Sequence, residues 1–397
     1  MIKLKLKKIL IKYSNVLLNF FIKFDLKFFC ALILYFNLRK FEKIPTNIIK
    51  KKIIVFSKSG GNEDILFAYK DQNLDNSIAF YELPRIFIKT IFYHFIAQEK
   101  YADYFTYDYN ENLKNNKLKY SLCIKEIFKK LDLLWKFDAV ISFNIFYYAE
   151  NNLPEAFQKI GKKFLVIHKE SVNSPEESII NFEVYRDKNR KSLADKVAVY
   201  CENEKNILID SNLLKPNQIE VIGCSRSGYS YELRDKKPSE KKIVYFMIET
   251  NRSNTEKMLK GELVNWTNLS MLTAEYLNEY AFKNPDAQII FKGKKNVHIF
   301  EDLPKNLSKN CQFELGNPGH KFLKDAKVII CFNSTIMFEA ILANRNIVIP
   351  NFGIDRTKLN KLIYKSPNCF ADTKDIFFDM IDKHLKKKYE KRKFSND

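Results

Sequence analysis

The sequence predicts the α/β class, with two doubly wound parallel sheets preceded by a basic helical prefix. Its 397 residues exceed one ordinary domain, since about 150 residues per domain is typical. From Lys50 onward, short apolar runs alternate with turn residues and amphipathic stretches, a rhythm typical of repeated strand and helix units. The rhythm stops in a polar segment, Ser225–Lys242, and then restarts, which predicts a second domain.

The prefix combines positive charge with many Phe, Leu and Ile residues. Residues 1–52 hold 13 Lys or Arg against 2 acidic residues. Lys23 and Asp25 interrupt the most hydrophobic stretch, Val16–Leu38, and charges at the centre of a bilayer are costly, so this stretch does not predict a spanning helix. It predicts helices that lie in an anionic membrane surface. The alternative is a helical prefix that packs on the first domain and exposes its lysines to water.

The net charge of +20 is concentrated at the two ends of the chain. Residues 383–397 hold 7 Lys or Arg against 2 acidic residues, and the 330 residues between the ends carry only +4. Lys outnumbers Arg by 57 to 10, although Arg is preferred for bidentate phosphate contacts. We therefore expect no nucleic-acid partner. The C-terminal basic run indicates either a second electrostatic contact or a frayed helical tail.

The seven cysteines are scattered along the chain, and no Cys-x-x-Cys pair occurs. Most of them lie in apolar runs, which predicts buried, reduced thiols rather than disulfides or a zinc site. Together with the basic prefix, this favours a cytoplasmic protein that is peripheral at the inner face of the cell membrane.

In the first domain, six apolar runs predict strands that are buried on both faces of a sheet. They are Lys52–Phe56, Ala79–Tyr81, Ala139–Phe143, Lys163–His168, Lys196–Tyr200 and Ile219–Ile222. The stretches Ile86–Tyr101, Leu118–Leu134 and Glu202–Ser211 predict helices. Ser59, Gly60 and Gly61 follow the first strand, where glycines allow a ligand to approach the backbone closely. An ordinary turn is the alternative, because the phosphate-loop spacing is absent.

The second domain repeats this architecture. Its predicted strands are Lys242–Ile248, Gln288–Lys292, Gln312–Leu315, Ala326–Phe332 and Asn346–Ile349, with helices at Trp266–Asn284 and from about Ser334. Two such Rossmann-like domains place a ligand in the cleft between the carboxyl ends of their strands. We therefore assign residues 1–48 to the prefix, 49–228 and 229–380 to the two domains, and 381–397 to a basic tail.

The segment 326–350 carries the most chemical information. A buried strand runs into Asn333, Ser334 and Thr335, which are candidates to cap the helix that contains Glu339. Free backbone amides at the start of a helix favour phosphate. A carboxylate one turn further can accept hydrogen bonds from ribose hydroxyls. The alternative is plain capping with a solvated glutamate.

This segment resembles the nucleotide-binding element of GT-B glycosyltransferases and of non-hydrolysing UDP-N-acetylglucosamine 2-epimerases. More narrowly, it is similar to capsule and surface-polysaccharide biosynthesis proteins. The resemblance implies that Ser334 and Thr335 hold the donor phosphate and that Glu339 holds the ribose. Two further segments carry it: the His-Lys-Glu end of Lys163–Ser171, and Ile219–Gly223 followed by Ser225 and Arg226. It spans residues 160–355, and it implies a GT-B fold whose domains face each other across a cleft.

The sequence also departs from these relatives. Many of them carry Lys-Pro-His-Pro where this chain reads Phe-Lys-Gly-Lys-Lys, and only Lys292 is kept as a cation for the diphosphate. The Glu-x7-Glu pattern of retaining enzymes is absent, because Cys331 stands eight residues before Glu339, which favours inversion. No Asp-x-Asp occurs. We therefore expect no metal and no other cofactor, with charge stabilisation from Lys292, helix ends and Arg226.

Inverting transfer needs a base opposite the donor. His168 and Glu170 lie at the carboxyl end of a predicted strand in the first domain. We rank His168 first, since histidine titrates near the working pH; a structural histidine is the alternative. His320 follows an Asn-Pro-Gly turn toward the same cleft, within reach of the donor phosphate or base.

The sequence thus predicts a glycosyltransferase that moves a sugar from a nucleotide-activated donor to a surface glycan or lipid-linked acceptor. Two alternatives remain. One is a nucleotide-sugar 2-epimerase of the same fold, which would not need the basic, aromatic prefix. The other is a non-catalytic glycan-assembly protein that keeps the fold without the chemistry.

Overall fold

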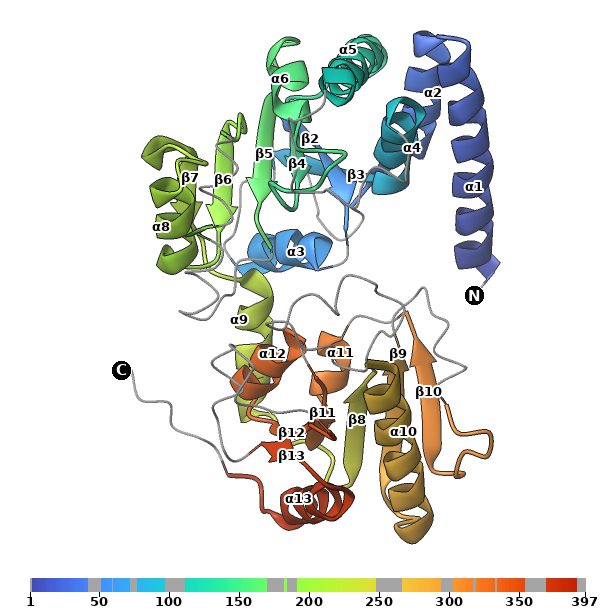
Figure 1. Ribbon diagram of the computed structural model, residues 1–397, viewed down its shortest axis with the longest axis vertical. Helices are drawn as coiled ribbons and strands as arrows, with labels where there is room; N and C mark the ends of the chain where they lie inside the picture. Colours follow the sequence, from blue (N-terminus) through green and yellow to red (C-terminus); the bar gives the residue numbers. More distant parts are fainter. Residues whose placement is uncertain are drawn as a thin grey trace. The chain divides into compact units, whose positions relative to one another are not determined.

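Two parallel sheets, one in each half of the chain, form the framework of the protein (Figure 1). The computed structural model describes residues 2–41, 51–58, 60–71, 77–96, 111–169, 182–183, 191–247, 266–293, 303–316, 319–332, 334–353 and 369–390. The first unit spans residues 1–173 and 177–225, and the second spans 174–176 and 226–397. The α/β class with two parallel-sheet, Rossmann-like domains is therefore confirmed, and the four-part division of the chain stays a prediction.

The first unit contains a seven-stranded sheet in the order β1-β3-β2-β4-β5-β6-β7. Its strands are β1 (Arg39–Lys40), β2 (Lys51–Ser57), β3 (Ile78–Pro84), β4 (Ala139–Ser142), β5 (Lys163–Ile167), β6 (Lys196–Val199) and β7 (Ile219–Val221). Neighbouring strands are parallel, except that β1 runs antiparallel to β3. The carboxyl ends of six strands therefore lie at one edge, where ligands bind in doubly wound sheets.

Helices cover both faces of this sheet. They are α3 (Gly61–Asp71), α4 (Arg85–Phe95), α5 (Glu111–Leu134), α6 (Leu153–Gln158) and α8 (Glu202–Asp210), with a short 3-10 helix at Pro216–Gln218. The larger core contains a cluster of Phe rings around Phe157, whose centroid lies 4.8 Å from that of Phe128 and 5.6 Å from that of Phe164. The smaller core, on α3, includes Val55 and Phe143.

The prefix forms two helices, α1 (Ile2–Lys23) and α2 (Lys27–Asn37), that pack on the first unit. Leu18, Ile22 and Leu34 are buried in the same core as residues of α4 and α5, and Figure 1 shows α1 beside α4. Thr90 Oγ1 of α4 donates to Asn15 Oδ1 of α1 at 2.6 Å. Of the helices in the described ranges, none is both long and apolar enough to cross a membrane.

The second unit contains a six-stranded parallel sheet in the order β10-β9-β8-β11-β12-β13. Its strands are β8 (Lys242–Phe246), β9 (Gln288–Gly293), β10 (Cys311–Leu315), β11 (Val328–Ile330), β12 (Asn346–Pro350) and β13 (Phe370–Ala371). Its helices are α9 (Ser225–Glu232), α10 (Trp266–Lys283), α11 (His320–Leu323), α12 (Ile336–Leu342) and α13 (Lys374–Lys386), with a 3-10 turn at Leu233–Asp235. Its core shares no residue with the cores of the first unit.

All eleven predicted strands are present, with ends that differ by a few residues. The largest differences are at Ala326–Phe332, where only Val328–Ile330 forms strand hydrogen bonds, and at Ala79–Tyr81, where the strand extends over Ile78–Pro84. The helix predicted over Ile86–Tyr101 ends at Phe95. The strands β1 and β13 were not predicted, because two residues carry no measurable periodicity.

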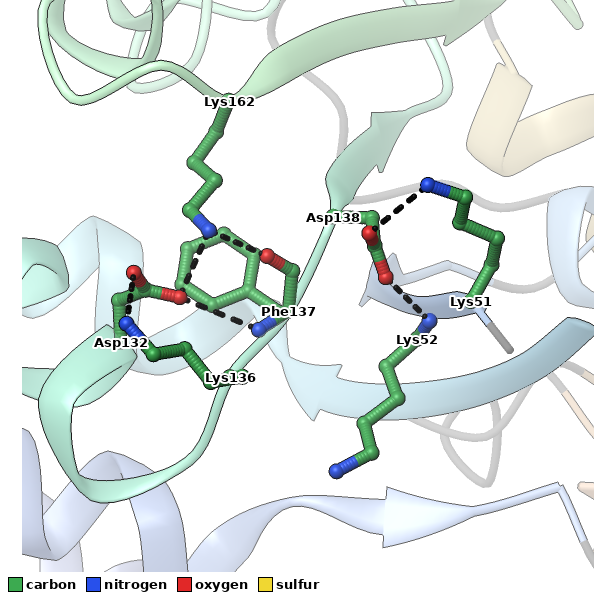
Figure 2. Close-up of polar contacts among 7 residues, drawn as sticks. All are labelled: Lys51, Lys52, Asp132, Lys136, Phe137, Asp138 and Lys162. Carbon is green, nitrogen blue, oxygen red and sulfur yellow. Dashed lines mark hydrogen bonds and ion pairs between the residues drawn. The ribbon is translucent and has the colours of Figure 1, made fainter. Parts of the chain in front are cut away.

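Ion pairs join the amino ends of neighbouring strands in the first sheet (Figure 2). Asp138 Oδ2 accepts from the Lys52 amide at 2.8 Å, and its Oδ1 lies 3.2 Å from Lys51 Nζ. Asp132 Oδ1 lies 2.7 Å from Lys162 Nζ and accepts from the Phe137 amide at 3.2 Å. These carboxylates hold β2, β4 and β5 in register, so their role is structural.

Candidate functional site

In the second unit, Arg226 and Glu339 lie close to each other. Arg226 lies in the first turn of α9 and Glu339 lies in α12. The distance from Arg226 Nη1 to Glu339 Oε1 is 4.0 Å, and the two side chains are only 15% and 12% exposed. A guanidinium and a carboxylate this far out of water can hold a phosphate and hydroxyl groups, respectively.

His320 lies beside the same helix, α9. It begins α11, and its ring centroid lies 5.1 Å from that of Tyr229, edge to face. The preceding residue is tightly packed, since a Cβ on Gly319 would lie 3.2 Å from the side chains of both Ile336 of α12 and Phe246 at the end of β8. This close approach holds the start of α11 against the start of α12. The helices α9, α11 and α12 therefore bring Arg226, His320 and Glu339 to one edge of the sheet.

Ser334 and Thr335 precede α12, as the sequence predicts. The Ile336 amide donates weakly to Ser334 Oγ at 3.5 Å, whereas the exposed Thr335 makes no capping bond with its side chain. Because α12 has only seven residues, its dipole is a minor source of anion affinity, and side-chain cations carry more of it. Asn333 lies outside the described residues.

Lys292 is a buried cation at the end of β9. Its ammonium donates to the carbonyl of Gly293 and lies 5.7 Å from the ring centroid of Phe322, two residues after His320 in α11. The side chain is thus directed along the carboxyl edge of β9 rather than into solvent. Its placement is compatible with the predicted contact to a diphosphate, which stays a prediction.

Arg345 joins the helices α11 and α12, and it was not singled out in the sequence analysis. Its Nε donates to Leu323 O at 2.7 Å and its Nη1 donates to Ala343 O at 2.7 Å, so one buried guanidinium joins the ends of α11 and α12. Its Nη2 donates to the carbonyls of Leu233, Lys236 and Lys324. Burial lowers the pKa of Arg345 below its ordinary value. The residue has no sequence signal, because it lies in a polar turn where arginine is ordinary.

In the first unit, His168 follows β5 and lies beside a carboxylate. Its amide donates to Ala198 O at 2.7 Å, and its Nε2 lies 3.4 Å from Glu204 Oε1. The two side chains are 2% and 1% exposed. The ring of Phe146 lies edge to face at 5.7 Å. A buried carboxylate this close can orient an imidazole.

Glu204 was missed because it lies in a polar helical stretch where a glutamate normally faces water. The available signal was its position, three residues after Cys201 at the carboxyl end of β6, the strand next to β5. Glu170, the second candidate base, lies outside the described residues.

Gly60 and Gly61 have structural roles at the start of α3. The Gly60 amide donates to Glu63 Oε2 at 2.6 Å, and its φ of 85° is one that glycine adopts readily. A Cβ on Gly61 would lie 2.2 Å from the Phe143 ring. Contact of these glycines with an acceptor stays a prediction, and Ser59 lies outside the described residues.

No protein-family model and no curated protein matches the chain. Among solved structures, it is similar to UDP-glucose: anthocyanidin 3-O-glucosyltransferase in complex with UDP (10% identity, 85% of this chain and 90% of that one, TM-score 0.45). It is also similar to a variant of the wall teichoic acid polymerase TagF (12%, 94% and 91%, 0.41). A third is the glycotransferase of kitacinnamycin (11%, 86% and 91%, 0.42). All three TM-scores lie below 0.5, so any assignment of function depends on the residues of this chain.

Proposed function

We propose that the protein is a metal-independent glycosyltransferase of the GT-B type that uses a nucleotide-activated sugar. The observation that carries this proposal is the 4.0 Å approach of Arg226 to Glu339 in the second unit, with His320 against Tyr229 of the same helix as Arg226. Arg226 and Lys292 bind the diphosphate, with the Thr335 hydroxyl as a further donor. Glu339 accepts hydrogen bonds from the ribose. The nucleotide sugar is a substrate, and no separate cofactor takes part.

The chemistry is a displacement with inversion. The acceptor hydroxyl attacks the anomeric carbon as His168 takes its proton, and the bond from that carbon to the diphosphate breaks with its electron pair on the departing oxygen. Glu204, whose Oε1 lies 3.4 Å from His168 Nε2, orients the imidazole. Arg226 and Lys292 neutralise charge on the leaving diphosphate.

The acceptor is a surface glycan or a lipid-linked glycan at the inner face of the cell membrane. An apolar face of α1 and α2 supports this location, because it exposes aromatic side chains next to lysines although both helices pack on the fold. The exposed large side chains are Ile9, Leu10, Tyr13, Val16, Leu17, Phe20, Phe24, Leu26, Phe28, Phe29, Tyr35 and Phe36. On α1 they recur every three or four residues, opposite the buried Leu18 and Ile22, with exposed Lys12 and Lys23 beside them.

Nucleotide binding and transfer test this function separately. A nucleoside diphosphate that binds only the native state raises the melting temperature. We expect Glu339→Ala to weaken this binding about tenfold or more, because it removes a charged hydrogen-bond acceptor, while Glu240→Ala, an exposed glutamate of the same unit, leaves it unchanged. His168→Asn should keep nucleotide binding and lose transfer by about 10²–10⁴-fold.

Other outcomes would contradict the proposal. Equal nucleotide binding by Glu339→Ala and Glu240→Ala rejects the donor site. If His168→Asn lowers the stability of the fold, and the protein that remains folded transfers sugar at the wild-type rate, His168 is a structural residue. Interconversion of nucleotide sugars without an acceptor favours the epimerase, and nucleotide binding with no turnover on any acceptor favours the assembly protein.

A further inference from the structure

Three cations gather around two tyrosines at the carboxyl edge of the first sheet. Arg85 follows β3 and begins α4, and its guanidinium carbon lies 3.6 Å from the centroid of the Tyr147 ring. Lys58, which follows β2, places its ammonium 5.8 Å from the same ring. Lys89, one turn after Arg85, places its ammonium 5.5 Å from the ring of Tyr148. Side chains from two strand ends and one helix face therefore converge on a single loop.

The guanidinium of Arg85 is held in place by a carboxylate, but not all of its N–H groups have a hydrogen-bond acceptor. It is 11% exposed, and its Nε donates to Glu150 Oε1. The other oxygen of Glu150 accepts from Ser142 at the end of β4, so both carboxylate oxygens are engaged. Arg85 Nη2 is buried and has no hydrogen-bond partner among the described residues. A buried, unsatisfied N–H group is costly, and an anionic ligand would satisfy it.

The surroundings of Lys89 also indicate an excess of positive charge. Burial and the charge of Arg85 lower the pKa of Lys89 below its ordinary value. Bringing a phosphate between the two cations would relieve this repulsion. Tyr148 is fixed in turn by the hydroxyl of Tyr93, two helical turns after Arg85, at 2.7 Å.

This group lies near the candidate base through Phe146, which precedes Tyr147 in the chain. Phe146 contacts the ring of His168. The next two residues, Tyr147 and Tyr148, are the ones whose rings lie against the three cations. We propose that Arg85, Lys89 and Lys58 bind a phosphate group of the acceptor beside His168. The inference rests on the proposed function and narrows its acceptor to a phosphate ester.

Acetylation of Lys89 measures occupancy of this site directly. Acetic anhydride reacts with the neutral form of a lysine amine, and peptide mass spectrometry gives the extent of acetylation at each lysine separately. With glycerol 1-phosphate present, we expect the acetylation of Lys89 to slow at least fivefold, while exposed Lys129 of the same unit keeps its rate. Arg85→Lys keeps a positive charge next to Glu150 but loses the planar, forked guanidinium, so it should abolish the protection of Lys89. Lys58→Gln leaves Arg85 and Glu150 in place and should weaken the protection of Lys89 severalfold.

A second arm distinguishes the source of the phosphate. Phosphatidylglycerol vesicles replace glycerol 1-phosphate, and Arg85-dependent protection by vesicles alone assigns the site to a lipid headgroup. Protection by the soluble ester assigns it to a free phosphate ester. The proposal is overturned if neither probe protects Lys89, or if protection is the same in wild type and Arg85→Lys. Nucleotide binding in the same samples keeps the proposed donor site separate from such a failure.

Discussion

At the scale of single residues, buried arginines do structural work that their neighbours in sequence do not reveal. Arg345 bonds to five backbone carbonyls and is 2% exposed, whereas Arg85 is held by the carboxylate of Glu150. The charge of Arg345 is tolerated because fixed carbonyls accept from its N–H groups, and that of Arg85 because a carboxylate lies against it. The two arginines differ in that Arg85 keeps one N–H unused.

Replacing Arg345 tests this account. Arg345→Met leaves several buried carbonyls without a donor, and each unsatisfied polar group costs about 1–3 kcal/mol. We expect the free energy of unfolding to fall by about 3 kcal/mol or more, measured by urea denaturation. Lys383→Met, which removes an exposed charge of α13, should change it by less than about 0.5 kcal/mol. Equal stability of the two variants would show that the carbonyls find water instead.

At the scale of elements, α1 and α2 have two apolar faces, and the fold covers only one. The inner face packs on α4 and α5, which confirms that the prefix packs on the first unit. The outer face leaves side chains such as Phe36 (72% exposed) and Val16 in solvent. Patches of this kind on soluble proteins mark interaction surfaces. The two sequence-based alternatives for the prefix are therefore compatible with each other.

A vesicle experiment tests the outer face. Val16→Glu with Phe20→Glu should lower binding to phosphatidylglycerol vesicles more than tenfold, since burial of each such side chain contributes about 1.5–3 kcal/mol and the new charges oppose an anionic surface. Leu133→Glu, at an exposed leucine of α5 outside the prefix, is the matched control. Cosedimentation that is unaffected by the double substitution would exclude this face as the membrane contact.

At the scale of the whole molecule, each unit has its own core. The aromatic cluster around Phe157 belongs to the first unit, and the core of the second is built from β8, β9, β11 and β12. Separate cores generally define separate cooperative units. A substitution that destabilises one core should therefore destabilise only the unit that contains it.

Hydrogen exchange measures this independence. Phe157→Ala removes a fully buried ring, at a cost of about 3–5 kcal/mol, and should speed amide exchange in β2, β4 and β5. We expect unchanged protection in β8, β9 and β11. Faster exchange in both sheets would mean that the two units unfold as one.

The class, the eleven main strands and the helical prefix follow from the amino-acid sequence alone, because the periodicity of apolar residues is a local property of short segments of the chain. The sequence also singled out Arg226 and Glu339, which lie 4.0 Å apart, and His320, which lies against Tyr229; their roles in binding stay predictions. Only the tertiary structure decided which polar groups become partners: His168 with Glu204, and Arg85 with Glu150, 65 residues apart. Such pairs depend on the order of strands in the sheet and on burial, and the spacing of residues along the chain contains neither.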